Sequence, residues 1–202
     1  MIDEEVLEDG KFLDFCEDYV ENLNFNELDF NKFYDYLEIN NCKFSNCKFY
    51  NGKYQGIDIV NSYFKSCNLS NVLLSERSYE KLIFDNCNLV GIDFTNSYLD
   101  YVEFNKCNLN YCNFSGCSLN NIKFNNCSFK DSYFNEIKFK KITFDGCDLS
   151  GSEFLHFKLK GLDFSSCNIN DIKVDINNLN GVLVSMEQAL ELSLLLGIKI
   201  KE

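Results

Sequence analysis

Large apolar residues recur at every fifth position over most of this chain. In the stretch FNKCNLNYCNFSGCSLNNIKFNNCSF they fall at Phe104, Leu109, Phe114, Leu119, Phe124 and Phe129. A helix face repeats about every 3.6 residues and a strand face about every 2 residues. Neither of the common secondary structures therefore explains the period, and the fold must repeat in units of five.

The positions around each large residue give the unit its shape. Two positions earlier lies a small or apolar residue, as at Cys42, Cys47 and Cys67. Two positions later, Gly or Asn occupies 15 of the 28 sites from Asn46 to Gly181, and these residues accept left-handed backbone at low cost. Each unit of five therefore predicts two inward side chains followed by a corner.

A second period of twenty residues predicts that four units make one square turn. Cysteine recurs at Cys47, Cys67, Cys87, Cys107, Cys127, Cys147 and Cys167. Phenylalanine recurs at Phe44, Phe64, Phe84, Phe104, Phe124, Phe144 and Phe164. Like side chains then stack in columns about 4.8 Å apart, and neighbouring backbones satisfy each other's hydrogen bonds as in a parallel ladder.

Two stretches interrupt the repeat. In SERSY, residues 75–79, Arg77 takes a small-residue position, and the unbroken cysteine column excludes an insertion there, so we predict a distorted face with a local bulge. In FYDYLEINN, residues 33–41, the register changes before Cys42. This second stretch is either part of a coil with an odd number of residues or an outward loop, and loops on rigid scaffolds often carry contacts.

Composition and charge set the outer limits. The chain has 202 residues, which suits a single domain, and it has no run of about 18 apolar residues and no secretory signal, so we expect a cytoplasmic protein. Residues 1–38 hold 13 acidic residues and 2 lysines, whereas residues 39–202 have a net charge of −1. A negative end repels nucleic acid and attracts a basic groove; the alternative is a solvated tail that aids solubility.

The cysteines and the single histidine do not form a recognisable metal-binding or catalytic pattern. Ten of the 11 cysteines occupy the inward small position, and their spacing lacks the paired C-x₂-C pattern of structural zinc, so we expect buried thiols, no metal and no cofactor. His156 falls at a corner position with no motif linking it to a nucleophile. With no phosphate-binding loop either, we expect a protein that is not an enzyme.

The C-terminal stretch SMEQALELSLLLGIKI, residues 185–200, predicts a helix. Ser185 and Gln188 form a capping-box pattern, and Gly197 can end the helix. Its leucines are too many for one buried stripe. One face can close the open end of the stacked coils, and the remainder favours a symmetric second copy.

At this point the chain resembles the pentapeptide-repeat family, which implies an all-β, right-handed quadrilateral parallel β-helix over residues 13–184. An acidic segment, 1–12, would precede it and a dimerisation cap, 185–202, would follow. The segments FYD at 33–35, CKF at 42–44, GCDLSGSEF at 146–154 and NGVLVSMEQALELSLLLGI at 180–198 also resemble the quinolone-resistance (Qnr-type) subfamily. That resemblance implies homodimers that bind DNA gyrase and topoisomerase IV and relieve fluoroquinolone poisoning, without binding nucleic acid directly.

The resemblance also implies particular contact residues. The partner-binding loop would be Tyr34, Asp35, Tyr36, Leu37, Glu38, Ile39, Asn40 and Asn41. The dimer interface would be Leu183, Met186, Ala189, Leu190, Ser193, Leu194 and Gly197. A second loop found in many members is missing, because the columns run unbroken from Cys87 to Cys127. Two mechanisms stay open, mimicry of DNA by the rod and direct contact by the loop, and two alternative functions are an interaction scaffold for another partner and immunity to a peptide gyrase poison.

Overall fold

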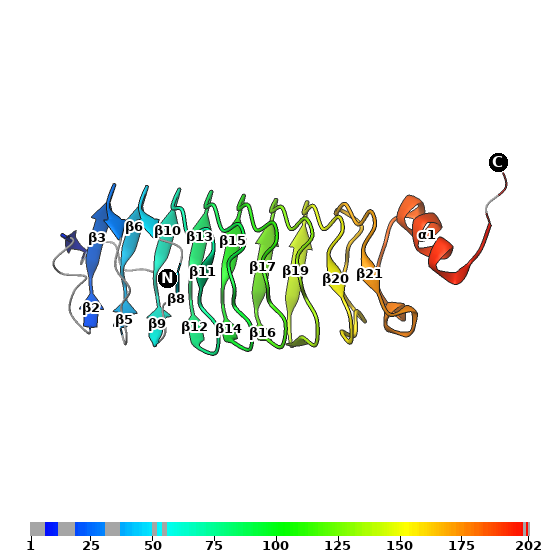
Figure 1. Ribbon diagram of the computed structural model, residues 1–202, viewed down its shortest axis with the longest axis horizontal. Coiled ribbons are helices and arrows are strands. Elements are labelled where there is room, and N and C mark those ends of the chain that lie inside the picture. The colour runs from blue at the N-terminus through cyan, green and yellow to red at the C-terminus, as the bar shows by residue number, and fades with distance from the viewer. Residues whose placement is uncertain are drawn as a thin grey trace.

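The computed structural model describes residues 7–11, 19–30, 37–49, 52–53, 56–199 and 201. Short strands follow one another around a rod, and successive coils stack along its long axis (Figure 1). Equivalent residues of neighbouring coils pair in parallel, as Phe64 does with Phe44 and Phe84. The chain is a right-handed quadrilateral parallel β-helix, as the sequence predicts.

Two faces of the rod are large parallel sheets. The eight-stranded sheet contains β1 (Glu8–Asp9), β3 (Leu23–Asn26), β6 (Lys43–Ser45), β10 (Tyr63–Lys65), β13 (Ile83–Asp85), β15 (Glu103–Asn105), β17 (Ile122–Asn125) and β19 (Ile142–Asp145). The seven-stranded sheet contains β2 (Tyr19–Glu21), β5 (Leu37–Asn40), β9 (Ile57–Val60), β12 (Ser78–Glu80), β14 (Tyr98–Asp100), β16 (Ser118–Asn120) and β18 (Lys138–Phe139).

The other two faces are held by shorter pairings. These are β4 (Asp29–Phe30) with β7 (Lys48–Phe49), β8 (Gly52–Lys53) with β11 (Val72–Leu73), and β20 (Glu153–Phe154) with β21 (Lys173–Val174). Single parallel bridges continue them, for example from Asn88 to Asn108. The chain ends in η3 (Ile176–Leu179), α1 (Met186–Ser193) and η4 (Leu194–Leu196).

Left-handed backbone turns the chain at the predicted corners. Asn86 and Asn126 have φ of 54° and 53°, and Gly91 has φ of 66°. Asn and Gly reach this region at low cost, but Lys81 and Tyr101 adopt it too, each with φ of 54°. The stacking of coils therefore imposes the corner even where the residue does not favour it.

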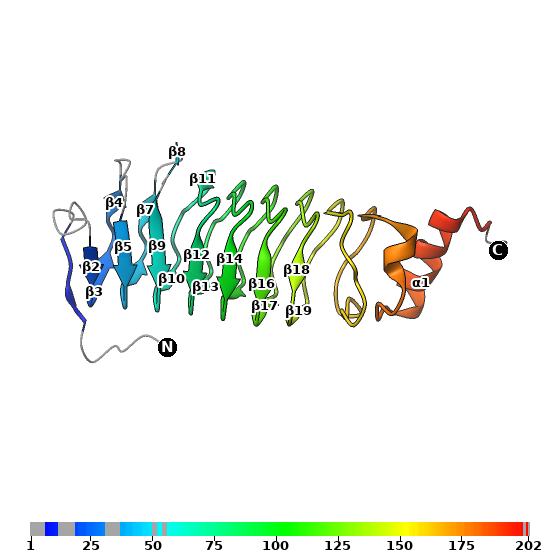
Figure 2. The same ribbon diagram turned by 90° about the horizontal axis from the view of Figure 1, so that it is seen from below.

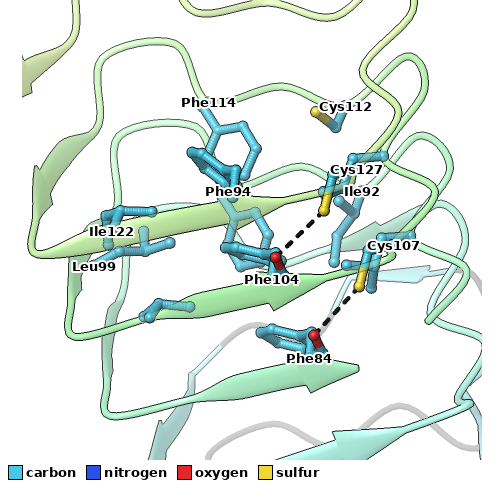
Figure 3. Packing of buried hydrophobic residues seen from close by; sticks show 14 of the residues in the cluster. Phe84, Ile92, Phe94, Leu99, Phe104, Cys107, Cys112, Phe114, Ile122 and Cys127 are labelled. Atoms are coloured by element: carbon cyan, nitrogen blue, oxygen red, sulfur yellow. Dashed lines mark hydrogen bonds between the residues drawn. The ribbon is translucent and has the colours of Figure 1, made fainter. Parts of the chain in front are cut away.

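The core consists of stacked columns of side chains, some of which Figure 3 shows. The rings of Phe84 and Phe104 are stacked with centroids 5.0 Å apart, which is close to one inter-strand spacing. The thiol of Cys107 donates to the carbonyl oxygen of Phe84 at 3.4 Å, and Cys127 makes the same contact with Phe104. Truncating a buried Phe of this kind to Ala costs about 3–5 kcal/mol, so each column contributes strongly to stability.

The N-terminal coils correct one predicted boundary and show where the register changes. Glu8 and Asp9 pair with β3, so the β-helix includes residues that the sequence analysis assigns to the acidic segment 1–12. The pairing of Phe30 with Phe49 spans 19 residues, whereas that of Leu37 with Ile57 spans 20. The register therefore changes between Phe30 and Leu37 in a coil with an odd number of residues.

The SERSY stretch is regular, so the predicted bulge is wrong. Tyr79 pairs with Ile59 and Leu99 at the standard offset of 20 residues. Its buried hydroxyl donates to the carbonyl oxygen of Leu74 at 3.1 Å, and Arg77 is only half-buried. The rod accommodates Tyr79 because its hydroxyl has an internal acceptor, and it accommodates Arg77 because that side chain is only partly buried.

Both large sheets stop about two coils before the end of the repeat at residue 184. Among the described residues, no backbone hydrogen bond joins 138–145 to 158–165, although the other two faces remain bonded, as in Leu149 N–H to Asn168 O at 2.7 Å. Phe157 follows Ile137 in the column that holds Ser97 and Cys117 in earlier coils, and its ring meets the half-buried Phe139 edge-on at 5.4 Å. The opening, which we call the seam, coincides with this ring.

The predicted helix closes the C-terminal end, as Figure 2 shows. Its capping box is formed as the sequence predicts, since Gln188 N–H donates to Ser185 Oγ and Ser185 N–H donates to Gln188 Oε1. The buried Nε2 of Gln188 also donates to the carbonyl oxygens of Phe164 and Cys167 at 2.8 and 2.6 Å. Gly197 ends η4 with φ of 74°.

Candidate interaction surfaces

The described part of the chain brings no catalytic or metal-binding group together. It contains no cluster of three His, Cys, Asp or Glu side chains that could hold a metal ion. His156 occupies an exposed corner with φ of 54°, and its Nδ1 lies 3.6 Å from Asp175. Among the described residues, the side chain of His156 contacts a carboxylate and no nucleophile.

The ten described cysteines are free and buried. Burial raises the pKa of the Cys42 thiol to about 11 and that of Cys117 to about 12. A thiol with a raised pKa stays protonated at neutral pH and is a poor nucleophile and metal ligand. Cys42 and Cys117 therefore act as small core groups, and their thiols donate weak hydrogen bonds to carbonyl oxygens of the preceding coil.

Acidic side chains lie opposite one another on the N-terminal half of the seven-stranded sheet. Glu38 pairs in register with Asp58, and Glu80 with Asp100. Like charges directly opposite each other destabilise a sheet, so this row favours a basic partner. Four of these coils therefore extend the acidic character of the N-terminus along one face.

Four of the eight residues predicted to form the partner-binding loop, Leu37–Asn40, lie in a strand. Tyr34, Asp35 and Tyr36 lie outside the described residues. Leu37–Asn40 forms β5, and Leu37 and Ile39 are buried in the core, so the prediction of a loop is wrong for these four residues. Their two-residue alternation with buried partners in β9 explains the strand. Glu38 remains exposed, and Asn41 forms the following corner.

The predicted dimer-interface residues gather on the outer side of the C-terminal cap. Met186 is 80% exposed and Leu190 is 51% exposed, while Leu192 packs against the core from the same helix. Leu183 and Leu194 are exposed as well. The cap therefore uses one face to close the rod and leaves a second apolar face in solvent, as its surplus of leucines predicts.

Sequence reasoning missed a shallow groove on the eight-stranded sheet. Tyr63, Ile83 and Tyr101 line it together with Lys106. The Tyr63 hydroxyl donates to Asp85 at 3.0 Å and so fixes one wall. The sequence signal that could have revealed this groove is Ile83, an apolar residue at an outward position one place before Phe84.

A family model for the pentapeptide repeat region matches residues 37–114 and 117–193. The comparison with curated proteins returns no match. Among solved structures, full-length QnrB1, a plasmid-mediated fluoroquinolone resistance protein, is 24% identical over 89% of this chain and 100% of its own, with a TM-score of 0.36. A trypsin-treated form of QnrB1 is 25% identical over 91% of this chain and 100% of its own, with a TM-score of 0.33.

A third similar structure is HetL, involved in heterocyst differentiation regulation in the cyanobacterium Nostoc sp. strain PCC 7120. It is 11% identical over 82% of this chain and 89% of its own, with a TM-score of 0.41. Stacked square coils of five-residue units define a parallel β-solenoid of the repeat class. Because the family model matches most of the sequence, the chain belongs to the pentapeptide-repeat family. Among the described residues, no helix is long and apolar enough to cross a bilayer.

Proposed function

We propose that this protein is a non-catalytic dimer that binds type II topoisomerases, DNA gyrase and topoisomerase IV, and protects them from fluoroquinolones. The C-terminal cap carries the proposal. The segment from 180 to 198 that resembles the Qnr-type ending forms a capped helix whose outer leucines are exposed. A rod with an apolar end and an acidic opposite end suits pairing of two copies and recognition of a basic enzyme surface.

The acidic row gives the enzyme contact its chemistry. Asp35 and Glu38 flank the start of β5, and Glu38 continues into the row through Asp58. We assign the enzyme contact to this N-terminal part of the rod and to Tyr34 and Tyr36, which precede β5 in the sequence. Complementary charges of this kind raise the association rate and fix the orientation of binding.

The charge distribution favours this direct contact over full DNA mimicry. Roughly eight coils at about 4.8 Å give a rod near 40 Å long, and an end-to-end dimer about twice that, which suits a stretch of duplex. The acid is concentrated at the N-terminal end, however, and residues 39–202 carry a net charge of only −1. A dimer joined through its caps would thus have acidic ends and a nearly neutral middle.

Supercoiling by gyrase in the presence of ciprofloxacin tests the proposal. We expect the protein to restore supercoiling, and the Glu38→Lys and Asp58→Lys double variant to restore it at least about tenfold less well, because steering charges are reversed. The matched control is Glu136→Lys with Asp171→Lys, two exposed carboxylates toward the other end. Lack of rescue of gyrase and topoisomerase IV by the parent protein would favour a scaffold for another partner. Rescue from a peptide poison alone would favour immunity.

A further inference from the structure

A second charged surface lies on the C-terminal half of the rod. It consists of the exposed side chains Lys138, Lys140, Lys141, Lys158 and Lys160, which we call the lysine corner. Lys138 and Lys158 occupy equivalent positions of successive coils, and so do Lys140 and Lys160. No ion pair joins any of the five to a carboxylate among the described residues.

Elsewhere on the rod, lysines pair with carboxylates of the neighbouring coil. Lys123 lies over Glu103 at 3.3 Å and Lys173 over Glu153 at 2.7 Å, each pair again 20 residues apart. Among the described residues, lysines 20 residues apart replace such pairs at the lysine corner. Because five exposed lysines without an ion pair gather on two successive coils, the corner favours an anion that would contact both rows.

The lysine corner also borders the seam. No backbone hydrogen bond joins Lys138–Lys141 to Phe157–Gly161. A methyl group built at Gly161 would have no atom within 4 Å, whereas one at Gly146 would press on Asn126 of the coil before. The Phe144 and Phe164 rings, which would otherwise stack, meet at 68°. Two independent features, an open corner and uncompensated cations, thus coincide.

We propose that the lysine corner binds the phosphodiester backbone of duplex DNA. Protein interfaces need exposed apolar or aromatic residues at their centre, and none of the exposed large apolar side chains lies between residues 134 and 175. A duplex instead offers about one negative charge per 1.7 Å of axis, dense enough to meet several lysines at once. The binding is therefore electrostatic and independent of sequence.

The acidic end does not oppose this binding. Glu38 lies five coils before Lys138, roughly 24 Å at about 4.8 Å per coil, and Asp100, the last residue of the acidic row, lies two coils before Lys140, roughly 10 Å. The Debye length at physiological ionic strength is about 8 Å, so the field of Glu38 is screened at the lysine corner and that of Asp100 is reduced. The nearby exposed carboxylates Glu136 and Asp145 form no ion pair with the corner. This inference revises the sequence-based expectation of no direct nucleic-acid binding.

Fluorescence anisotropy of a labelled duplex of about 20 base pairs tests the proposal, with the protein alone and no topoisomerase. We expect binding that weakens steeply between 50 and 200 mM salt, as phosphate contacts release counterions. The Lys140→Gln and Lys160→Gln double variant should lower the slope of log K against log salt by about 2 and weaken binding about tenfold or more.

The matched control is Lys65→Gln with Lys106→Gln, which removes the same charge from two exposed lysines outside the corner. It should change neither quantity by more than about a third of the corner variant's effect. Equal losses in both variants, or no binding by the parent at 50 mM salt, would overturn the proposal. So would salt-sensitive self-association that the corner variant abolishes without any binding of DNA, since the lysines would then meet the acidic row of a second copy. The anisotropy assay contains no topoisomerase, so a negative result would not bear on the proposed protection of the enzyme.

Discussion

At the scale of single residues, burial explains most of what the side chains do. The sequence predicts inward thiols from spacing alone, and the structure confirms that the ten described cysteines are buried. Tyr79 and Phe157 could not be interpreted in the same way, because the effect of a large residue depends on the acceptor or space that the next coil offers. Tyr79 finds the Leu74 carbonyl, whereas Phe157 coincides with the break in the ladder.

The raised thiol pKa values predict how stability depends on pH. Cys117 has a pKa of about 12 in the folded protein against an ordinary value of 9.0, so the unfolded chain releases its proton first as pH rises. The free energy of unfolding should stay level below about pH 8 and then fall, approaching about 1.4 kcal/mol per pH unit for each such thiol.

Urea unfolding followed by circular dichroism at about pH 7, 9 and 10 measures this slope. Tyrosine and lysine also titrate in this range, so the informative comparison is with Cys117→Ala. This variant should show a shallower decline than the parent above pH 9. An identical pH dependence in both proteins would show that Cys117 does not contribute.

At the scale of elements, some features follow from local sequence patterns and others depend on tertiary contacts. The capping box at Ser185 and Gln188 is a local pattern, and the structure confirms it. The change of register is also visible in the sequence, but only the pairings of Phe30 and Leu37 show where the odd residue falls. The local sequence does not reveal strand β5, because the pairing that forms it comes from β9, 20 residues later.

Gln188 should be the key residue of the cap. Its Nε2 is the donor for the carbonyl oxygens of Phe164 and Cys167, and both would lose that partner in Gln188→Leu. We expect a loss of about 2–4 kcal/mol in the free energy of unfolding, since each buried acceptor left without a partner costs about 1–3 kcal/mol. Urea unfolding compares it with Glu191→Gln, an exposed helical site outside the proposed dimer interface that is expected to change stability by less than about 0.5 kcal/mol. Equal stability of the two variants would contradict this role.

At the scale of the whole molecule, the repeat makes the rod predictable and leaves its surfaces less so. Two inward residues per unit of five determine the core, so the columns follow from the sequence. Outward positions tolerate any polar residue, and the period carries no information about them. The acidic row and the lysine corner emerge only when coils are stacked, because Glu38 and Asp58, or Lys138 and Lys158, are 20 residues apart.

The cap predicts that the molecule is a dimer in solution. Leu190 and Leu194 are 51% and 57% exposed, and an isologous contact between two copies would bury both. We expect Leu190→Glu with Leu194→Glu to halve the mass measured by light scattering, because two buried carboxylates in an apolar interface carry a large desolvation cost. The circular dichroism spectrum should not change, since both side chains already face solvent. Leu73→Glu, at an exposed apolar site in β11 far from the cap, should leave the mass unchanged. A parent protein that is monomeric at tens of micromolar would contradict the dimer and would leave the outer leucines to contact the enzyme itself.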